Sequence, residues 1–235
     1  MTVTIHTIPL GFDQCYVVRG DGVIVIDAGQ PGKAADFASE LEAAGIDSSE
    51  VRLIVLTHGH WDHIGSAMEI RALTGAPLAM HRAEAGAVKE APVPLSPGVT
   101  RWGRTLNVLQ RPILRFVKVP PVEIDLELDD DDMSLEDYGV AGRIIHTPGH
   151  SPGSVSVLLD SGEAFVGDLA MNRLPLRRSP GLPIFAGDRS AVIDSWKHLL
   201  ALGASTIYPA HGEAFPAVVM EIAVSDATAA TGAGH

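Results

Sequence analysis

The 235-residue chain contains little cysteine, and it has no long uninterrupted run of apolar residues. Its single cysteine, Cys15, excludes an internal disulfide, which fits a reducing compartment. No stretch approaches the roughly 20 apolar residues of a membrane span. Residues 1–15 lack the basic and apolar regions of a secretion signal. We therefore expect a cytoplasmic protein that does not associate stably with a membrane.

Positive charge is also scarce. The chain carries 17 basic against 29 acidic side chains, a formal net charge of −12. A chain of this charge is repelled by the phosphates of DNA and RNA, so we expect no nucleic-acid partner and favour a small-molecule substrate. Apolar residues make up 46% of the sequence, enough to bury a substantial core. We expect residues 1–235 to form a single domain.

The first part of the chain has the pattern of an α/β protein. "CYVV" and "VIVID" flank the turn at residues 20–22, which predicts a β-hairpin whose second strand ends at Asp27. Apolar residues at helical spacing predict a helix over residues 33–45, which Gly45 ends. The apolar "LIVL" that follows, residues 53–56, reads as a buried strand.

The second half repeats this plan. Strands are expected at residues 142–147, 154–159, 163–168 and 205–210, with a helix from Arg189 to about Leu202 that Asp188 caps. Two halves built of strands and flanking helices predict an α/β fold, an αββα sandwich of two mixed sheets packed face to face with helices outside.

A segment between the halves, residues 84–121, fits neither pattern. It contains six prolines, and from Arg101 to Lys118 it carries five basic residues and no acidic one. We predict an insertion that folds as a cap over the candidate metal site, which is built from the histidines and aspartates named below. Trp102 and Phe116 would line an apolar pocket, and the arginines would point outward. A homodimer contact and a membrane-surface helix are the alternatives.

The densest cluster of ionisable residues is "LTHGHWDHIG", residues 56–65, directly after the predicted buried strand. His58 and His60 are two apart in extended chain, so both imidazoles project to one side and can share a metal ion. Further candidate ligands follow later apolar runs, in turns rich in glycine or proline: His150, Asp168 and His211. Three protein ligands with an open position for water are typical of a catalytic metal site.

These blocks in this order, "DAG", "THGHWDHIG", "TPGHSPGS", "GD" and "PAHG", resemble the metallo-β-lactamase-fold hydrolase superfamily. The resemblance spans most of the chain. It implies an αββα sandwich with a two-metal site at one edge. It assigns His58, His60 and His150 to the first metal and Asp62, His63 and His211 to the second. Asp168 would bridge the two ions, and Asp27 would orient a ligand histidine.

The implied cofactors are two divalent ions, zinc first, with iron or manganese possible because imidazoles and carboxylates select weakly among them. The implied reaction is hydrolysis by a metal-bridging hydroxide, with Asp62 or a metal-bound water passing a proton to the leaving group. A small ester, thioester or lactone is the expected substrate, as in the glyoxalase-II-like and lactonase-like branches.

Two alternatives within the superfamily remain. One is a di-iron redox protein, but such proteins typically carry Glu where His60 stands. The other is a mononuclear iron sulfur dioxygenase, which would use only the first site and leave Asp62, His63 and His211 without a metal. We also keep three arginines after Asp168 as candidate substrate contacts, Arg173, Arg177 and Arg178.

Overall fold

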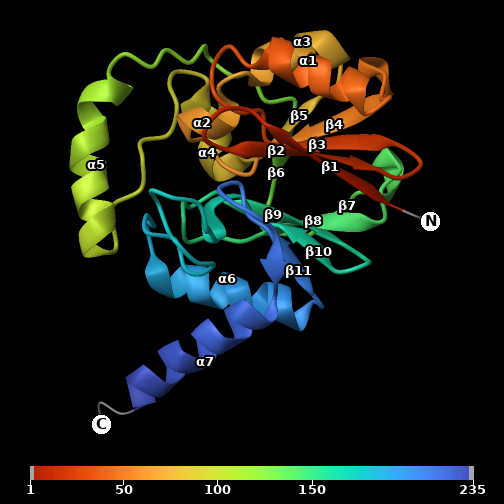
Figure 1. The fold of residues 1–235 in the computed structure, drawn as a ribbon. Helices are drawn as coiled ribbons and strands as arrows, with labels where there is room; N and C mark the ends of the chain where they lie inside the picture. The colour runs from red at the N-terminus through yellow and green to blue at the C-terminus, as the bar shows by residue number, and fades with distance from the viewer. Residues whose placement is uncertain (1–2, 233–235) are drawn as a thin grey trace.

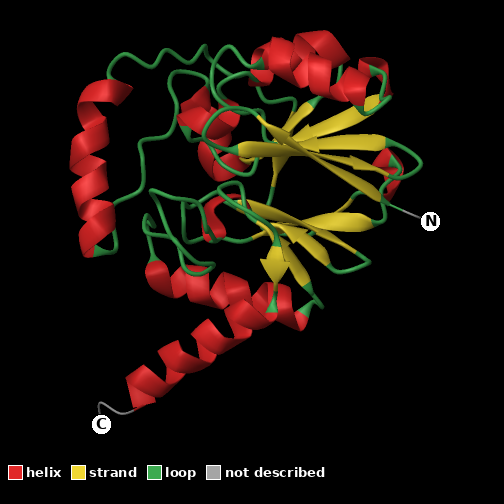
Figure 2. Cartoon of the chain, viewed as in Figure 1, coloured by secondary structure: helices red, strands yellow, loops and turns green. Residues whose placement is uncertain are grey.

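The computed structural model describes the backbone of residues 3–232 and the side chains of residues 3–225. Two six-stranded sheets lie face to face, with helices on the outer surface of each (Figures 1 and 2). The expected αββα sandwich of two mixed sheets is confirmed. The hairpin strands, the helix after Asp188 and the strand before the histidine cluster all form where the sequence predicts them.

The first sheet has the order β1-β2-β3-β4-β5-β6. Its strands are β1 Thr4–Pro9, β2 Gln14–Arg19, β3 Val23–Ile26, β4 Val51–Val55, β5 Leu78–His81 and β6 Leu126–Leu128. The first three pair antiparallel, and β3 to β6 pair parallel. The carboxyl ends of four neighbouring strands therefore lie at one edge of the sandwich.

The second sheet has the order β12-β11-β10-β9-β8-β7. Its strands are β7 Met133–Ser134, β8 Gly142–His146, β9 Val155–Leu159, β10 Glu163–Phe165, β11 Thr206–Tyr208 and β12 Phe215–Pro216. All pairs are antiparallel except β10 with β11. After the strand predicted at residues 205–210, the two-residue β12 folds back on β11.

Helices cover both outer faces. Above the first sheet lie α1 Ala34–Ala43 and α3 Ala67–Thr74, and below the second lie α6 Arg189–Ala201 and α7 Val218–Gly232 (Figure 1). The short helices α2 Trp61–Ile64 and α4 Arg82–Val88 follow β4 and β5. Helix α5, Arg101–Leu114, stands beside the sandwich at the edge where α2 lies (Figure 1).

The side chains of β3 alternate between two apolar cores, one on each face of the first sheet. Val23 and Val25 pack with the helices above the first sheet, while Ile24 and Ile26 pack between the sheets. Because successive side chains point to opposite faces, a strand covered on both sides must be apolar throughout. The uninterrupted "VIVI" therefore places β3 in the interior, and Leu53, Ile54 and Val55 of β4 beside it alternate in the same way.

Candidate metal centre

The residues that the sequence singled out come together at one edge of the sandwich. His58 and His60 lie in the loop between β4 and α2, and His150 lies in the loop between β8 and β9. Asp168 follows β10, and His211 follows β11. All seven predicted ligands are buried, and they form two adjacent groups: His58, His60, His150 and Asp168, then Asp62, His63 and His211.

In the first group, three imidazole nitrogens converge. His60 Nδ1 lies 2.9 Å from His58 Nε2 and 3.0 Å from His150 Nε2. His150 Nδ1 faces the backbone oxygen of Phe185 at 3.0 Å, so Nδ1 carries the proton and Nε2 presents a lone pair. Lone pairs that face one another without protons to share suit a common cation, which is the requirement of a metal site.

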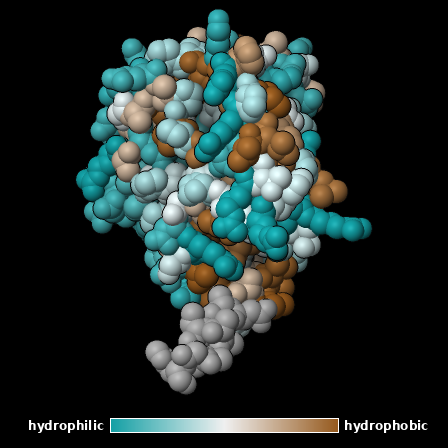
Figure 3. Space-filling view, turned by 90° about the vertical axis from the view of Figure 1, so that its left-hand side faces the viewer, coloured by the Kyte–Doolittle hydropathy of each residue, from teal (hydrophilic) through white to brown (hydrophobic). Residues whose placement is uncertain are grey.

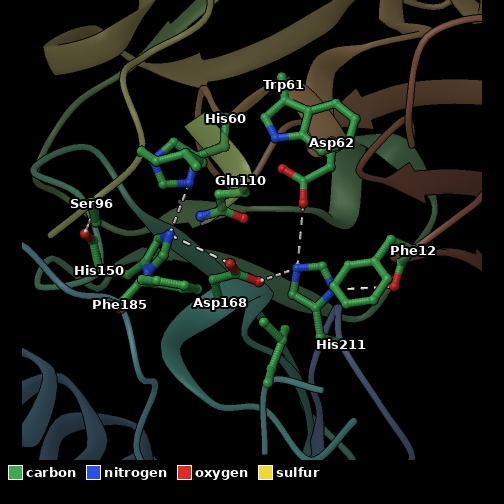
Figure 4. A pocket seen from close by; sticks show the side chains of 12 residues that line it. Phe12, His60, Trp61, Asp62, Ser96, Gln110, His150, Asp168, Phe185 and His211 are labelled. Carbon is green, nitrogen blue, oxygen red and sulfur yellow. Dashed lines mark hydrogen bonds and ion pairs between the residues drawn. The ribbon is translucent and has the colours of Figure 1, made fainter. Parts of the chain in front are cut away.

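Asp168 lies between the two groups, as Figure 4 shows. Its Oδ2 is 3.5 Å from His150 Nε2, and its Oδ1 is 3.2 Å from His211 Nε2 and 3.5 Å from His63 Nε2. Each oxygen thus faces one group, the arrangement that a bridging carboxylate needs. Among the described residues, the buried atoms Asp168 Oδ1 and His63 Nε2 have no hydrogen-bond partner, which also fits metal ligation.

Asp27 orients His63. Its Oδ2 lies 2.9 Å from His63 Nδ1, and its Oδ1 accepts the backbone N–H of Thr57 at 2.8 Å. Asp27 has a φ of +62°, a left-handed conformation that Asp and Asn adopt more readily than most residues. The geometry is that of a carboxylate which fixes the tautomer of a ligand histidine.

The two groups differ in their affinity for protons. Burial, reinforced by the neighbouring histidines, holds the pKa of His58 and of His60 well below the ordinary value. Burial also works against protonation of His211, but the carboxylates of Asp168 and Asp62 outweigh it and raise the pKa of His211 to about 9. His63 behaves likewise, since Asp27 and Asp168 outweigh burial and raise its pKa. In the metal-free protein, the second group therefore holds protons that a metal must displace.

Glu84 is a residue that the sequence did not single out. Its buried carboxylate accepts the backbone N–H of Gly59 at 2.6 Å, the N–H of Gly153 at 2.8 Å and the hydroxyl of Ser151. A Cβ at Gly59 would lie 2.6 Å from Val93 Cγ2, so only glycine leaves room for this approach. Glu84 therefore links the loop of His58 and His60 to the loop of His150.

A pocket of about 60 Å³ opens beside the two groups. Besides five of the predicted ligands, its lining is largely apolar: Phe12, Trp61, Leu95, Leu176 and Phe185, with the polar Ser96 and Gln110. Gln110 comes from α5, so the segment between the halves does contribute to the site.

The predicted apolar lining by Trp102 and Phe116 is wrong. Trp102 is 47% exposed and donates its indole N–H to the backbone oxygen of Pro175 at 2.7 Å, and Phe116 is 85% exposed. Leu106 and Gln110 face inward, whereas Trp102 lies in the first turn of the helix, beside Pro175, and Phe116 follows the end of the helix at Leu114. The arginines of α5 are exposed as expected.

Two of the arginines after Asp168 donate hydrogen bonds to backbone oxygens. Arg173 donates to the backbone oxygen of Phe12 at 2.9 Å, and His211 Nδ1 lies 3.2 Å from the same oxygen. Arg177 donates to the backbone oxygens of Ser179 and Leu182. Arg173 and Arg177 therefore hold loops in place, and neither lines the pocket.

Comparison with known families agrees with this geometry. The model of the metallo-β-lactamase superfamily matches residues 8–211. The chain belongs to the metallo-β-lactamase superfamily.

Three relatives illustrate the similarity by sequence. An uncharacterised protein of Mycobacterium tuberculosis is 28% identical over 84% of this chain and 85% of its own length. A probable metallo-hydrolase of Methanocaldococcus jannaschii is 31% identical over 62% of each chain. A hydroxyacylglutathione hydrolase of Acidiphilium cryptum is 30% identical over 57% of this chain and 41% of its own length.

Solved structures share the fold. The BLEG-1 B3 metallo-β-lactamase superposes with a TM-score of 0.67 at 23% identity, over 92% of this chain and 95% of its own. The protein TTHA1623 in a di-iron-bound form gives a TM-score of 0.64 at 23% identity, over 94% and 98%. Within residues 3–232, no helix is long and apolar enough to cross a membrane.

Proposed function

We propose that this protein is a dinuclear metallo-hydrolase that acts on a small, uncharged ester, thioester or lactone. The observation that carries the proposal is Asp168, whose two carboxylate oxygens face two separate groups of buried ligands. The family and its probable metallo-hydrolase members support the reaction class. We further propose zinc as the metal and the cytoplasm as the location, the latter because the single cysteine fits a reducing compartment.

The residues divide the work between metal binding and proton transfer. His58, His60 and His150 would hold one ion, and Asp62, His63 and His211 the other. When bound, two such ions polarise a carbonyl and lower the pKa of a water to near neutrality. In the hydrolysis, the oxygen of water forms a bond to the acyl carbon, and the acyl–oxygen or acyl–sulfur bond breaks. Asp62 lines the pocket, and we assign it the transfer of the proton to the leaving alcohol or thiol.

The pocket lining supports the choice of substrate class. No lysine or arginine lines it among the described residues, so a carboxylate or phosphate of a substrate would find no cationic side chain there. That weighs against β-lactams, which carry a carboxylate, and against phosphodiesters. The aromatic and aliphatic side chains suit a small acyl group. The similarity to a hydroxyacylglutathione hydrolase supports a thioester among the candidates.

A redox or dioxygenase function is the alternative, since a solved structure of this fold binds two irons. We favour hydrolysis because His60 occupies the position where di-iron redox relatives typically carry Glu, and because both ligand groups are complete.

The test loads the metal-free protein with zinc, manganese or iron and measures turnover of p-nitrophenyl acetate, S-phenyl thioacetate, γ-butyrolactone, bis-p-nitrophenyl phosphate and a chromogenic cephalosporin. We expect hydrolysis of the first three in the zinc protein and none of the last two. Turnover of the phosphodiester or the cephalosporin alone would refute the proposed substrate class. Oxygen consumption with a persulfide, by the iron protein only, would favour the dioxygenase.

A further inference from the structure

The inward face of α5 carries the residues that attach this helix to the site. Gln110 comes four residues after Leu106 and three after Asn107, so it shares one side of the helix with both. Leu106 packs against the cluster that contains Leu176 and Phe185, two residues that line the pocket. Asn107 donates its side-chain N–H to the backbone oxygen of Ser96 at 3.1 Å. The next residue on this face is Gln110.

Gln110 directs its amide into the pocket. In Figure 4 the amide lies among His60, His150, Asp62 and Asp168. No hydrogen bond joins this amide to any other residue in the described part of the chain, although an amide offers two donors and an acceptor. Its neighbours on the outer face, Val108 and Leu109, are about 60% exposed. The one amide side chain that lines the pocket is thus free to bind a substrate.

Two contacts near its start hold helix α5 beside the pocket. Thr100 caps its first turn through the N–H of Gly103 at 2.9 Å, and Trp102 donates to the backbone oxygen of Pro175. These two contacts and the hydrogen bond of Asn107 all lie in the part of the helix that comes before Gln110. They fix the position of the helix and so the position of the Gln110 amide. The outer face that Figure 3 turns toward the viewer mixes long hydrophilic with hydrophobic side chains.

We propose that Gln110 is a catalytic residue that donates an N–H hydrogen bond to the carbonyl oxygen of the substrate as that oxygen gains negative charge. The proposal rests on the hydrolysis proposed above. Gln110 lines the same small pocket as His60, Asp62, His150 and Asp168, so a carbonyl bound at the candidate metal centre enters the space into which this amide points. A donor already in place stabilises the charged transition state more than the neutral ester, so it raises kcat rather than affinity.

The decisive variant is Gln110→Leu, which keeps the size of the side chain and removes the amide. With p-nitrophenyl acetate as the probe, we expect kcat to fall about 10²- to 10³-fold while KM changes only a few-fold. Metal content and Tm should match the wild type. Leu109→Ala, on the outer face of the same helix, is the matched control and should leave kcat unchanged.

A second comparison identifies the oxygen that the amide contacts. A contact with the carbonyl oxygen predicts the same loss for p-nitrophenyl acetate and phenyl acetate, which differ only in the leaving group. A loss that grows with the pKa of the leaving group would overturn the carbonyl assignment. Apart from the histidines of the candidate metal centre, Trp61 is the other lining side chain with an N–H donor. If Trp61→Phe lowers kcat as described and Gln110→Leu does not, the proposal is wrong.

Binding of butyrate, a carboxylate product, separates this proposal from the proposed function. Calorimetry with the zinc-loaded protein should show weaker binding in Gln110→Leu than in Leu109→Ala. If butyrate binds more weakly to Gln110→Leu but no probe is hydrolysed, the proposed hydrolysis is refuted and the contact of Gln110 with the ligand is retained. Turnover and butyrate binding that are both unchanged in Gln110→Leu would refute the contact and retain the hydrolysis.

Discussion

Two groups of histidines lie at the same edge of the sandwich, and their rings are arranged differently. In the candidate metal centre, the rings of His58, His60 and His150 are almost perpendicular to one another, at 79° to 83°. The other group is His81, at the end of β5, and His146, at the end of β8, whose rings stack at 4.0 Å and 8°. Because an imidazole lone pair lies in the plane of its ring, perpendicular rings can aim at one point and stacked rings cannot.

The second nitrogen of each ring reinforces the difference. In the candidate metal centre, His150 and His63 are anchored through Nδ1, so Nε2 faces the site. His81 Nδ1 instead accepts the backbone N–H of Ala83, so its Nε2 carries the proton and donates to Asp130, which is largely exposed. A histidine therefore becomes a candidate ligand through its ring orientation and its anchor, and its nearness to an aspartate is not sufficient.

The largest effect should come from a matched pair of aspartates. Asp168→Ala should bind about one metal ion per chain rather than two and lose most of the hydrolysis, because both groups lose their shared carboxylate. Asp130→Ala removes the corresponding aspartate of the stacked pair and should bind metal as the wild type does. Elemental analysis and turnover of p-nitrophenyl acetate test the pair. Equal metal loss in both variants would contradict the distinction between the candidate metal centre and the stacked histidine pair.

Proton competition should separate the two ligand groups. The raised pKa values of His63 and His211 mean that the second ion displaces at least one proton, so its apparent affinity should rise at least about tenfold per pH unit up to pH 9. The first group has lowered pKa values and should show no such slope above pH 6.5. Zinc titrations at pH 6.5, 7.5 and 8.5 measure both slopes. Identical slopes would argue against two distinct groups.

The same protons affect the metal-free fold. A histidine whose pKa is raised on folding stabilises the protein fully below its unfolded pKa, near 6.5, and this stabilisation is lost as the pH rises through about 9. The Tm of the metal-free protein should therefore fall across this window, and saturating zinc should reduce the fall.

Removing the anchor of His63 should have a smaller effect. Asp27→Asn preserves a side chain that tolerates the positive φ but weakens the hold on His63, and should cost about 10- to 100-fold in affinity for the second ion. Asp36→Asn, whose carboxylate forms an exposed ion pair with Lys33, is the control. Full affinity in Asp27→Asn would show that the His63 ring needs no anchor.

The smallest effect is expected at Glu84, which supports two ligand loops without facing a ligand. Glu84→Gln replaces a carboxylate that accepts three hydrogen bonds with an amide that must point a donor at one of them. The cost should be about 1–3 kcal/mol of unfolding free energy. Urea unfolding of the metal-free protein measures it, and an unchanged midpoint would show that the loops keep their positions without this carboxylate.

The sequence predicted the two-sheet sandwich because apolar runs such as "VIVI" and "LIVL" are buried on both faces. It also predicted the ligand set, since His58, His60, Asp62 and His63 form a dense motif and the remaining ligands end later strands. The structure brings these residues together as expected, and their role as ligands stays a prediction. It did not reveal β1, where the burial pattern is mixed and the apolar signal weak.

The contributions of Gln110 and Glu84 could not be read from the sequence either. Glu84 looks like an ordinary helical charge, and only the tertiary approach of the loops at Gly59 and Gly153 makes it a buried acceptor. Trp102 of α5 and Phe116, just after its end, are the aromatic residues of this segment and were expected inside. The inward face is decided by the contacts of Leu106 and Asn107, which depend on residues far along the chain.

The central claim, two metal ions held by two distinct ligand groups, is tested most directly by counting bound ions. Metal-free wild type and His63→Ala are saturated with zinc at pH 8, and the ions per chain are determined by elemental analysis together with turnover. The account predicts about two ions in the wild type and about one, with most activity lost, in His63→Ala. One ion per chain in both proteins, with activity unchanged, would contradict it.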